Sequence, residues 1–210
     1  MPNLCESCGF LVGACRLCFY TCSQAICCRK PPVSRPEFAA VCLGLSNVGK
    51  TTILTNLCGE DESSIVPTVG FSIKAVGFND AILNIKELGG AENIRQYWNR
   101  YYDGAEAVVF VIDSASAEDN MQQIADEMKA ALCHNHLKGL PLLVLAHCQD
   151  KDGARGIEEI TELLDLEMIG EGRQWIVHAS SINDNSTIRG GFTKLIHLLL
   201  GTDEVDSNRI

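Results

Sequence analysis

Residues 44–51 read GLSNVGKT, and they follow the apolar run FAAVCL at residues 38–43. This is the pattern G-x-x-x-x-G-K-[ST] between a strand-like run and a helical run at 52–58, which is the context of a phosphate-binding loop. Glycines in such a loop let backbone N–H groups close around a phosphate, and the start of the helix adds its positive end. The predicted nucleotide-binding residues are Gly44, Leu45, Ser46, Asn47, Val48, Gly49, Lys50, Thr51 and Thr52.

Two side chains of this loop carry specific chemistry. Lys50 places a positive charge against the β- and γ-phosphates of a nucleotide, and the hydroxyl of Thr51 is a ligand for Mg²⁺. The loop therefore predicts a nucleotide that is bound together with magnesium.

Strand-like and helical runs alternate along the rest of the chain, and two strand-like runs flank a turn at 78–80. This alternation predicts an α/β fold with a mostly parallel six-stranded sheet, one antiparallel edge hairpin and helices on both faces. Ligands of such sheets lie at the carboxyl ends of the strands. The expected strands are 38–43, 71–77, 81–86, 107–112, 140–146 and 174–179, and the expected helices are 52–58, 117–132, 157–166 and 187–200.

The composition fits a folded chain and argues against one class of partner. Of 210 residues, 46% are hydrophobic and 21% are charged, and the net charge is −10. A broad nucleic-acid surface requires a basic face, so no nucleic-acid partner is expected. We expect three parts: a cysteine-rich segment with a Pro-rich linker at 1–36, the nucleotide domain at 37–200, and a short acidic tail at 201–210.

Seven of the eleven cysteines lie in the first 28 residues. Residues 9–28 are mostly apolar but contain Arg16, which makes them a poor membrane span. Thiols on an interfacial helix beside the basic pair Arg29-Lys30 are typical of reversible S-palmitoylation. The lipidation hypothesis names Cys22, Cys27 and Cys28 and predicts a membrane-tethered chain.

Two other interpretations of these cysteines stay open. Cys5-x-x-Cys8 and Cys15-x-x-Cys18 form two pairs that could bind a metal, although the six residues between the pairs are fewer than zinc sites usually have. The segment could also be a cysteine-rich disordered tail. The remaining cysteines are expected to be reduced core residues: Cys42, Cys58, Cys133 and Cys148.

Three motifs resemble the ADP-ribosylation factor family of small GTPases over about residues 37–200. They are Gly44-Leu45 at the start of the phosphate loop, PTVGF at 67–71, and LGG at 88–90 followed by Ile94-Arg95 and Trp98. The resemblance implies a switch that binds GTP or GDP with Mg²⁺. It assigns Thr68 to Mg²⁺ and the γ-phosphate, and Gly90 to the γ-phosphate through its N–H.

The resemblance also implies how the switch is used. In this family the hairpin between the two switch regions shifts register with the nucleotide and displaces the N-terminal helix. Effector proteins are expected to bind between Thr68 and Tyr102, with Trp98 and Tyr101 on the effector face. Cyclin-M-type magnesium transporters are a further implied partner class. The implied location is the cytoplasmic face of Golgi, endosomal or plasma membranes, with a cytosolic pool.

Two departures from the family pattern concern hydrolysis. The family motif Asp-x-Gly-Gly-Gln is replaced by residues 87–91, ELGGA. Ala91 stands where the family has the glutamine that orients the attacking water, so hydrolysis is expected to be very slow or absent. Glu87 stands where the family has an aspartate that reaches Mg²⁺ through water. A GTPase completed by an activating protein and a nucleotide-independent scaffold remain alternatives.

A third departure concerns the base. The family reads guanine with Asn-Lys-x-Asp, whereas this chain has HCQD at 147–150. Asp150 can still accept from guanine N1–H and N2–H, and His147 can offer one N–H donor. The pair Ala179-Ser180 is expected to back the base through main-chain N–H groups.

Overall fold

The computed structural model describes residues 34–61 and 65–202. All residues named in the lipidation and metal hypotheses for the N-terminal segment lie outside these ranges, as does most of the tail expected at 201–210. Everything below concerns the unit that begins at Pro36.

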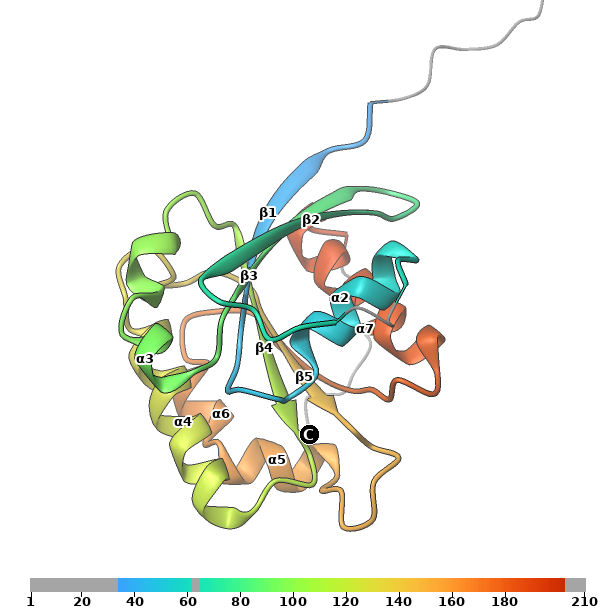
Figure 1. Ribbon diagram of the computed structural model, residues 1–210. Coiled ribbons are helices and arrows are strands. Elements are labelled where there is room, and N and C mark those ends of the chain that lie inside the picture. The colour runs from blue at the N-terminus through green and yellow to red at the C-terminus, as the bar shows by residue number, and fades with distance from the viewer. Residues whose placement is uncertain (1–33, 62–64, 203–210) are drawn as a thin grey trace, which may run out of the picture. The chain divides into compact units, whose positions relative to one another are not determined.

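A six-stranded sheet forms the centre of this unit, in the order β2-β3-β1-β4-β5-β6 (Figure 1). The edge strand β2 pairs antiparallel with β3, and the other neighbours pair in parallel. The predicted α/β architecture, with its single antiparallel edge hairpin, is therefore confirmed. The strands are β1 Glu37–Leu43, β2 Phe71–Gly77, β3 Ile82–Leu88, β4 Ala107–Asp113, β5 Leu142–His147 and β6 Trp175–Ala179.

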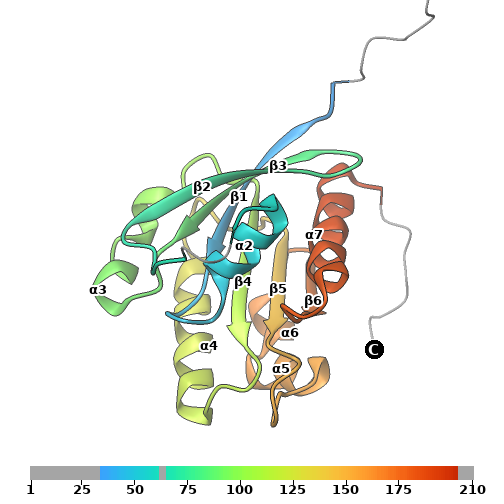
Figure 2. The same ribbon diagram turned by 45° about the vertical axis from the view of Figure 1, so that its right-hand side comes forward.

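Helices cover both faces of the sheet (Figures 1 and 2). The helices α2 and α7 lie side by side on one face, and α3, α4 and α5 lie on the other. Among residues 34–61 and 65–202, no helix is both long and apolar enough to cross a bilayer. The helical elements are α2 Lys50–Cys58, α3 Glu92–Arg95, the 3-10 helix η2 Trp98–Tyr101, α4 Glu118–Leu132, α5 Ile157–Leu163, α6 Leu166–Ile169 and α7 Asn185–Leu200.

One expected helix is interrupted. The run 157–166 was predicted as continuous, but α5 ends at Leu163 and Asp165 has a left-handed backbone with φ 49°. An α-helix cannot continue through that conformation, so the chain restarts as the short α6.

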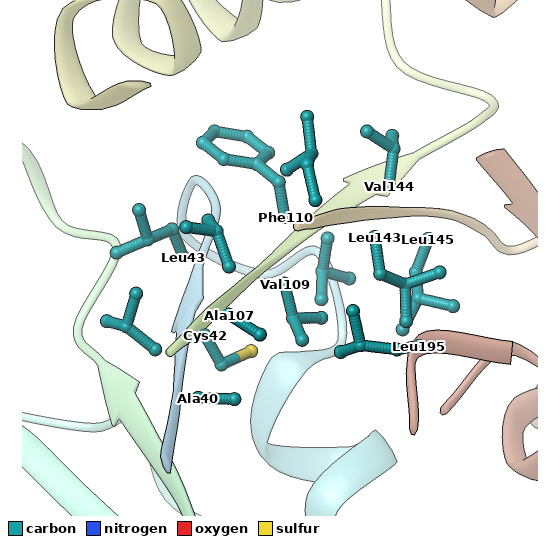
Figure 3. Packing of buried hydrophobic residues seen from close by; sticks show 14 of the residues in the cluster. Ala40, Cys42, Leu43, Ala107, Val109, Phe110, Leu143, Val144, Leu145 and Leu195 are labelled. Carbon is teal, nitrogen blue, oxygen red and sulfur yellow. The ribbon is translucent and has the colours of Figure 1, made fainter. Parts of the chain in front are cut away.

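The core lies where strands are covered on both faces, which is why β4 and β5 are apolar along almost their whole length. Figure 3 shows Phe110 and Val144 pointing to one side of the sheet and Cys42 and Val109 to the other. Burial raises the pKa of the Cys42 thiol to about 12, which keeps it protonated. The expectation of four core cysteines is wrong for the others: Cys133 is exposed, and Cys58 and Cys148 are half-buried.

Candidate functional site

The phosphate loop connects β1 to α2, and two of its glycines are required by geometry. Gly44 has φ 145°, and a Cβ added there would lie 2.3 Å from the carbonyl oxygen of Val111. Gly49 has φ 91° and forms the left-handed N-cap of α2. Side chains rarely adopt these conformations, so the loop takes this path because glycine stands at both places. Between them, Leu45 and Val48 are buried, and Ser46 and Asn47 are exposed.

Lys50 is held at this loop by two backbone carbonyls of the loop. Its Nζ donates to Gly44 O at 2.9 Å and to Leu45 O at 2.7 Å. The side chain is buried, and this burial lowers the pKa of Lys50 from its ordinary value. The ammonium group is therefore held within the phosphate loop, and its contact with the β- and γ-phosphates stays a prediction.

Three oxygen atoms meet beside Lys50 although they come from distant parts of the chain. Thr51 Oγ1 lies 2.5 Å from Glu87 Oε1 and 3.2 Å from Thr68 Oγ1, and Thr68 Oγ1 lies 3.2 Å from Glu87 Oε1. Glu87 is completely buried, and its second oxygen, Oε2, has no hydrogen-bond partner among the described residues.

This oxygen cluster fits magnesium. Mg²⁺ prefers hard oxygen ligands and is usually held by one or two carboxylates together with phosphates. A buried carboxylate with an unpartnered oxygen is costly unless a cation is present. Thr51, Thr68 and Glu87 would hold the ion, which would supply positive charge against the phosphate oxygens.

The segment after β3 packs directly on the phosphate loop. A Cβ added to Gly90 would lie 2.4 Å from the carbonyl carbon of Leu45, so only glycine fits there. Gly89 N–H donates to Gly70 O at 2.9 Å, which joins the two predicted switch regions. Ala91 follows as the N-cap of α3 and brings only a methyl group to this position.

The prediction that Trp98 belongs to an exposed effector face is wrong. Trp98 is 3% exposed, its Nε1 donates to Gly89 O at 2.8 Å, and its ring meets Phe110 edge-on. The residue is part of the core, and its hydrogen bond to Gly89 attaches the second switch region to that core. Tyr101 is half-buried, and its ring lies 4.9 Å from that of Phe71 on the edge strand β2.

His147, the last residue of β5, is buried between two loops of the site. It is 3% exposed, its Nδ1 lies 3.1 Å from Ser180 Oγ, and its ring edge packs against Gly49. Burial lowers the pKa of His147, which favours the neutral imidazole. Its ring connects the phosphate loop to the loop after β6, and the expectation that His147 offers an N–H donor to the base stays a prediction.

Asp150 is exposed and held from both sides. Its Oδ1 accepts from Ser181 Oγ at 2.6 Å, and its Oδ2 accepts from Asn183 Nδ2 at 3.0 Å. The hydrogen bond from Ser181 is the main reason that the pKa of Asp150 is lowered. The carboxylate is thus ionised and oriented at the carboxyl end of β5.

Sequence reasoning placed the supporting loop too early in the chain. Ala179 belongs to β6, and Ser180 N–H donates to Ala146 O at 2.9 Å. That N–H is already used by the fold, so the residues beside Asp150 are Ser181 and Asn183. In the sequence, Ser181 and Asn183 could be recognised only by their distance from the end of β6. That distance is known only once the last residue of β6, Ala179, is known.

Comparison with known proteins places this geometry in a family. The model of the ADP-ribosylation factor family matches residues 27–199. The chain belongs to this family. ADP-ribosylation factor-like protein 15 of Mus musculus and of Homo sapiens is 49% identical over 180 residues, which covers 86% of this chain and 88% of each relative. ADP-ribosylation factor-like protein 3 of Chlamydomonas reinhardtii is 39% identical over 155 residues, 74% of this chain and 86% of the relative.

A solved structure supports the same conclusion. The Arl6 BBS3 small GTPase of Trypanosoma brucei, with the bound nucleotide analogue GppNp, superimposes with a TM-score of 0.71 at 28% identity. The match covers 80% of this chain and 99% of that one. As an ADP-ribosylation factor family member, the chain is a small GTPase with the fold of a GTP-binding switch.

Proposed function

We propose that the chain is a membrane-tethered switch that acts by binding partners when GTP is present and hydrolyses GTP very slowly on its own. The observation that carries the proposal is Ala91, which brings a methyl group to the edge of an otherwise complete phosphate site. Lys50, the oxygen cluster of Thr51, Thr68 and Glu87, and the packing of the second switch on the loop support tight nucleotide binding.

The methyl group of Ala91 cannot orient water. Even small GTPases that have the glutamine hydrolyse unaided at about 10⁻⁴ s⁻¹. Ala91 is half-exposed, so an activating protein has access to donate the missing groups. This access favours an assisted GTPase as the second candidate function.

An exposed apolar strip supports partner binding. Phe71 and Ile73 lie on the outer strand β2 and are 48% and 60% exposed, and Val69, just before it, is 87% exposed. Apolar side chains on an open edge strand mark an interaction surface. Because the strip begins next to Gly70, which contacts the second switch, its arrangement can report the bound nucleotide. Cyclin-M-type magnesium transporters are a partner class to test here.

The end of β5 supports guanine as the base. Asp150, ionised and held by Ser181 and Asn183, can accept from guanine N1–H and N2–H, whereas adenine presents a different edge. His147 supports this site because its ring contacts both Ser180, after β6, and Gly49 of the phosphate loop.

Membrane tethering is proposed from the sequence of the N-terminal segment. One acyl chain gives only marginal anchoring, and two signals are needed for a stable anchor. Cys22, Cys27 and Cys28 can supply several chains, and the neighbouring Arg29 and Lys30 favour anionic head groups. The proposed location is the cytoplasmic face of Golgi, endosomal or plasma membranes, together with a cytosolic pool.

The test combines nucleotide identification with partner capture. Mass spectrometry of the purified chain should find retained guanine nucleotide, and Lys50→Ala or Thr51→Asn should remove it. Pull-down with a cyclin-M cytosolic module should be stronger for the GTP-analogue form than for the GDP form. Wild-type nucleotide retention in both variants would refute the phosphate site. Equal capture by all forms would instead favour the nucleotide-independent scaffold.

A further inference from the structure

We propose that Glu87 is a direct ligand of the magnesium ion, in the place that a water molecule takes when an aspartate stands there. The inference rests on the proposed function, namely that the chain binds a nucleotide together with Mg²⁺. It concerns the carboxylate itself, whose side chain is one methylene longer than the aspartate of the family pattern.

The first argument is the spacing of the oxygens. An octahedral Mg²⁺ has six ligands at about 2.0–2.1 Å, so neighbouring ligand oxygens lie about 2.9 Å apart. The three oxygens of Thr51, Thr68 and Glu87 are separated by 2.5, 3.2 and 3.2 Å. They therefore already have the dimensions of one triangular face of the octahedron. The same spacing is also that of hydrogen bonds, with Thr51 Oγ1 donating to Glu87 Oε1, so the reach of the Glu87 side chain decides between direct ligation and ligation through a water.

The second argument is the burial of the carboxylate. Glu87 is fully buried, and Oε2 finds no hydrogen-bond donor among the described residues. The nearby cation, Lys50, directs its ammonium group to two backbone carbonyls of the phosphate loop. Lys50 thus makes no hydrogen bond to the Glu87 carboxylate. A cation in contact with the carboxylate would remove this imbalance.

The third argument is that the backbone at Glu87 cannot move away from the site. Glu87 lies in β3 between two paired strands, opposite Cys42 of β1 and Ser72 of β2. Its Cα is therefore fixed on both sides, and the length of the side chain decides how far the carboxylate reaches. An aspartate is shorter by one C–C bond, about 1.5 Å, which leaves room for a water in front of it.

The experiment counts water ligands. The full chain is loaded with Mn²⁺ and a non-hydrolysable GTP analogue, and electron paramagnetic resonance in ¹⁷O-enriched water gives the number of bound waters. Thr51, Thr68, Glu87 and two phosphate oxygens fill all but one of the octahedral positions. We expect one water in the wild type and one more in Glu87→Asp. Equal numbers in the two proteins, or two or more waters in the wild type, would overturn the assignment.

A second measurement does not depend on that spectroscopy. Release of a fluorescent guanine nucleotide is followed against free Mg²⁺, and Glu87→Asp should need several-fold more Mg²⁺ for half-maximal retention. Glu118→Asp, at the exposed start of α4, is the matched control and should behave as the wild type. A Glu87→Asp curve that overlies the wild type would contradict direct ligation.

The outcomes also separate the two proposals. If the chain retains no nucleotide in excess Mg²⁺, the proposed function fails and this inference fails with it. If nucleotide is retained but the water counts and Mg²⁺ curves are equal, only the direct ligation of Glu87 is refuted. Thermal unfolding of each variant confirms that a change does not come from loss of the fold.

Discussion

Replacing His147 tests whether a single buried ring joins the two halves of the nucleotide site. The ring lies between Ser180 and the phosphate loop, with Nδ1 3.1 Å from Ser180 Oγ. A Cβ at Gly49 would lie 2.8 Å from its Cδ2, so ring and loop are in close contact. We expect His147→Ala to destabilise the fold strongly and His147→Asn to be milder, because asparagine keeps a polar group at this place.

The size of the effect follows from two terms. Ser180 is 1% exposed, and His147 is the partner of its hydroxyl, so truncation leaves that hydroxyl unsatisfied at a cost of about 1–3 kcal/mol. The lost ring contacts and the cavity add roughly 1–2 kcal/mol, less than for a larger aromatic residue. The free energy of unfolding should therefore fall by about 3 kcal/mol for His147→Ala at pH 7.5.

The same ring should make stability depend on pH. The unfolded chain takes up a proton on His147 near pH 6.5, whereas burial lowers the pKa in the folded protein and keeps the ring neutral. The charges of Asp150 and Asp113 act in the opposite direction but are the smaller effect. The unfolded state thus binds more protons below about pH 6.5, and stability is lost as pH falls, by up to about 1.4 kcal/mol per pH unit.

Denaturant unfolding at several values between pH 7.5 and 5.5 measures both effects. His178 must be controlled, because burial also lowers its pKa and it titrates in the same window. Its ring contacts the carbonyl of Thr187, away from the phosphate loop. His178→Gln alone should keep the part of the slope that belongs to His147. A flat wild-type profile, or a slope in His147→Asn equal to that of the wild type, would refute the argument.

Three further predictions address hydrolysis, the membrane and the second switch. Ala91→Gln should raise single-turnover phosphate release above the wild-type rate, and a wild-type rate typical of family members that have the glutamine would contradict the role given to Ala91. Joint replacement of Cys22, Cys27 and Cys28 by serine should move the protein from membranes to cytosol without loss of GTP binding. Fractionation with hydroxylamine tests this, and association that survives both treatments would favour anchoring by other means. Trp98→Phe loses the hydrogen bond to the switch carbonyl and should lower the free energy of unfolding by about 1 kcal/mol or more; an unchanged denaturation midpoint would count against that contact.

The fold was predictable because its signals are local. The phosphate loop fixes a strand before it and a helix after it, and the observed β1 and α2 meet that expectation. The continuous apolar runs of β4 and β5 predict strands that are covered on both faces. The break at Asp165 was not predictable, because a single left-handed residue does not disturb the hydrophobic periodicity around it.

The site was only partly predictable because side-chain direction is set by tertiary packing. The positions of Lys50 and Thr51 at the start of α2 follow from the sequence, since both belong to one continuous motif. It could not tell that Trp98 turns inward to Gly89, or that His147 turns toward Ser180. Both facts depend on contacts between segments that are far apart along the chain.

The contacts that would transmit the nucleotide state do not pass through the side chain that is missing. Gly90 packs on the phosphate loop, its carbonyl accepts from Arg95 at 3.1 Å, and the preceding carbonyl accepts from Trp98. All of these contacts use backbone atoms of the switch, so the change of Gln to Ala at position 91 leaves them intact. Under the proposed function, the switch would then read GTP without hydrolysing it. Its return to the resting state would come from an activating protein or from nucleotide release. In the second case the dissociation rate would set the lifetime of the active form, and the proposed direct ligation by Glu87 would slow that rate through the metal.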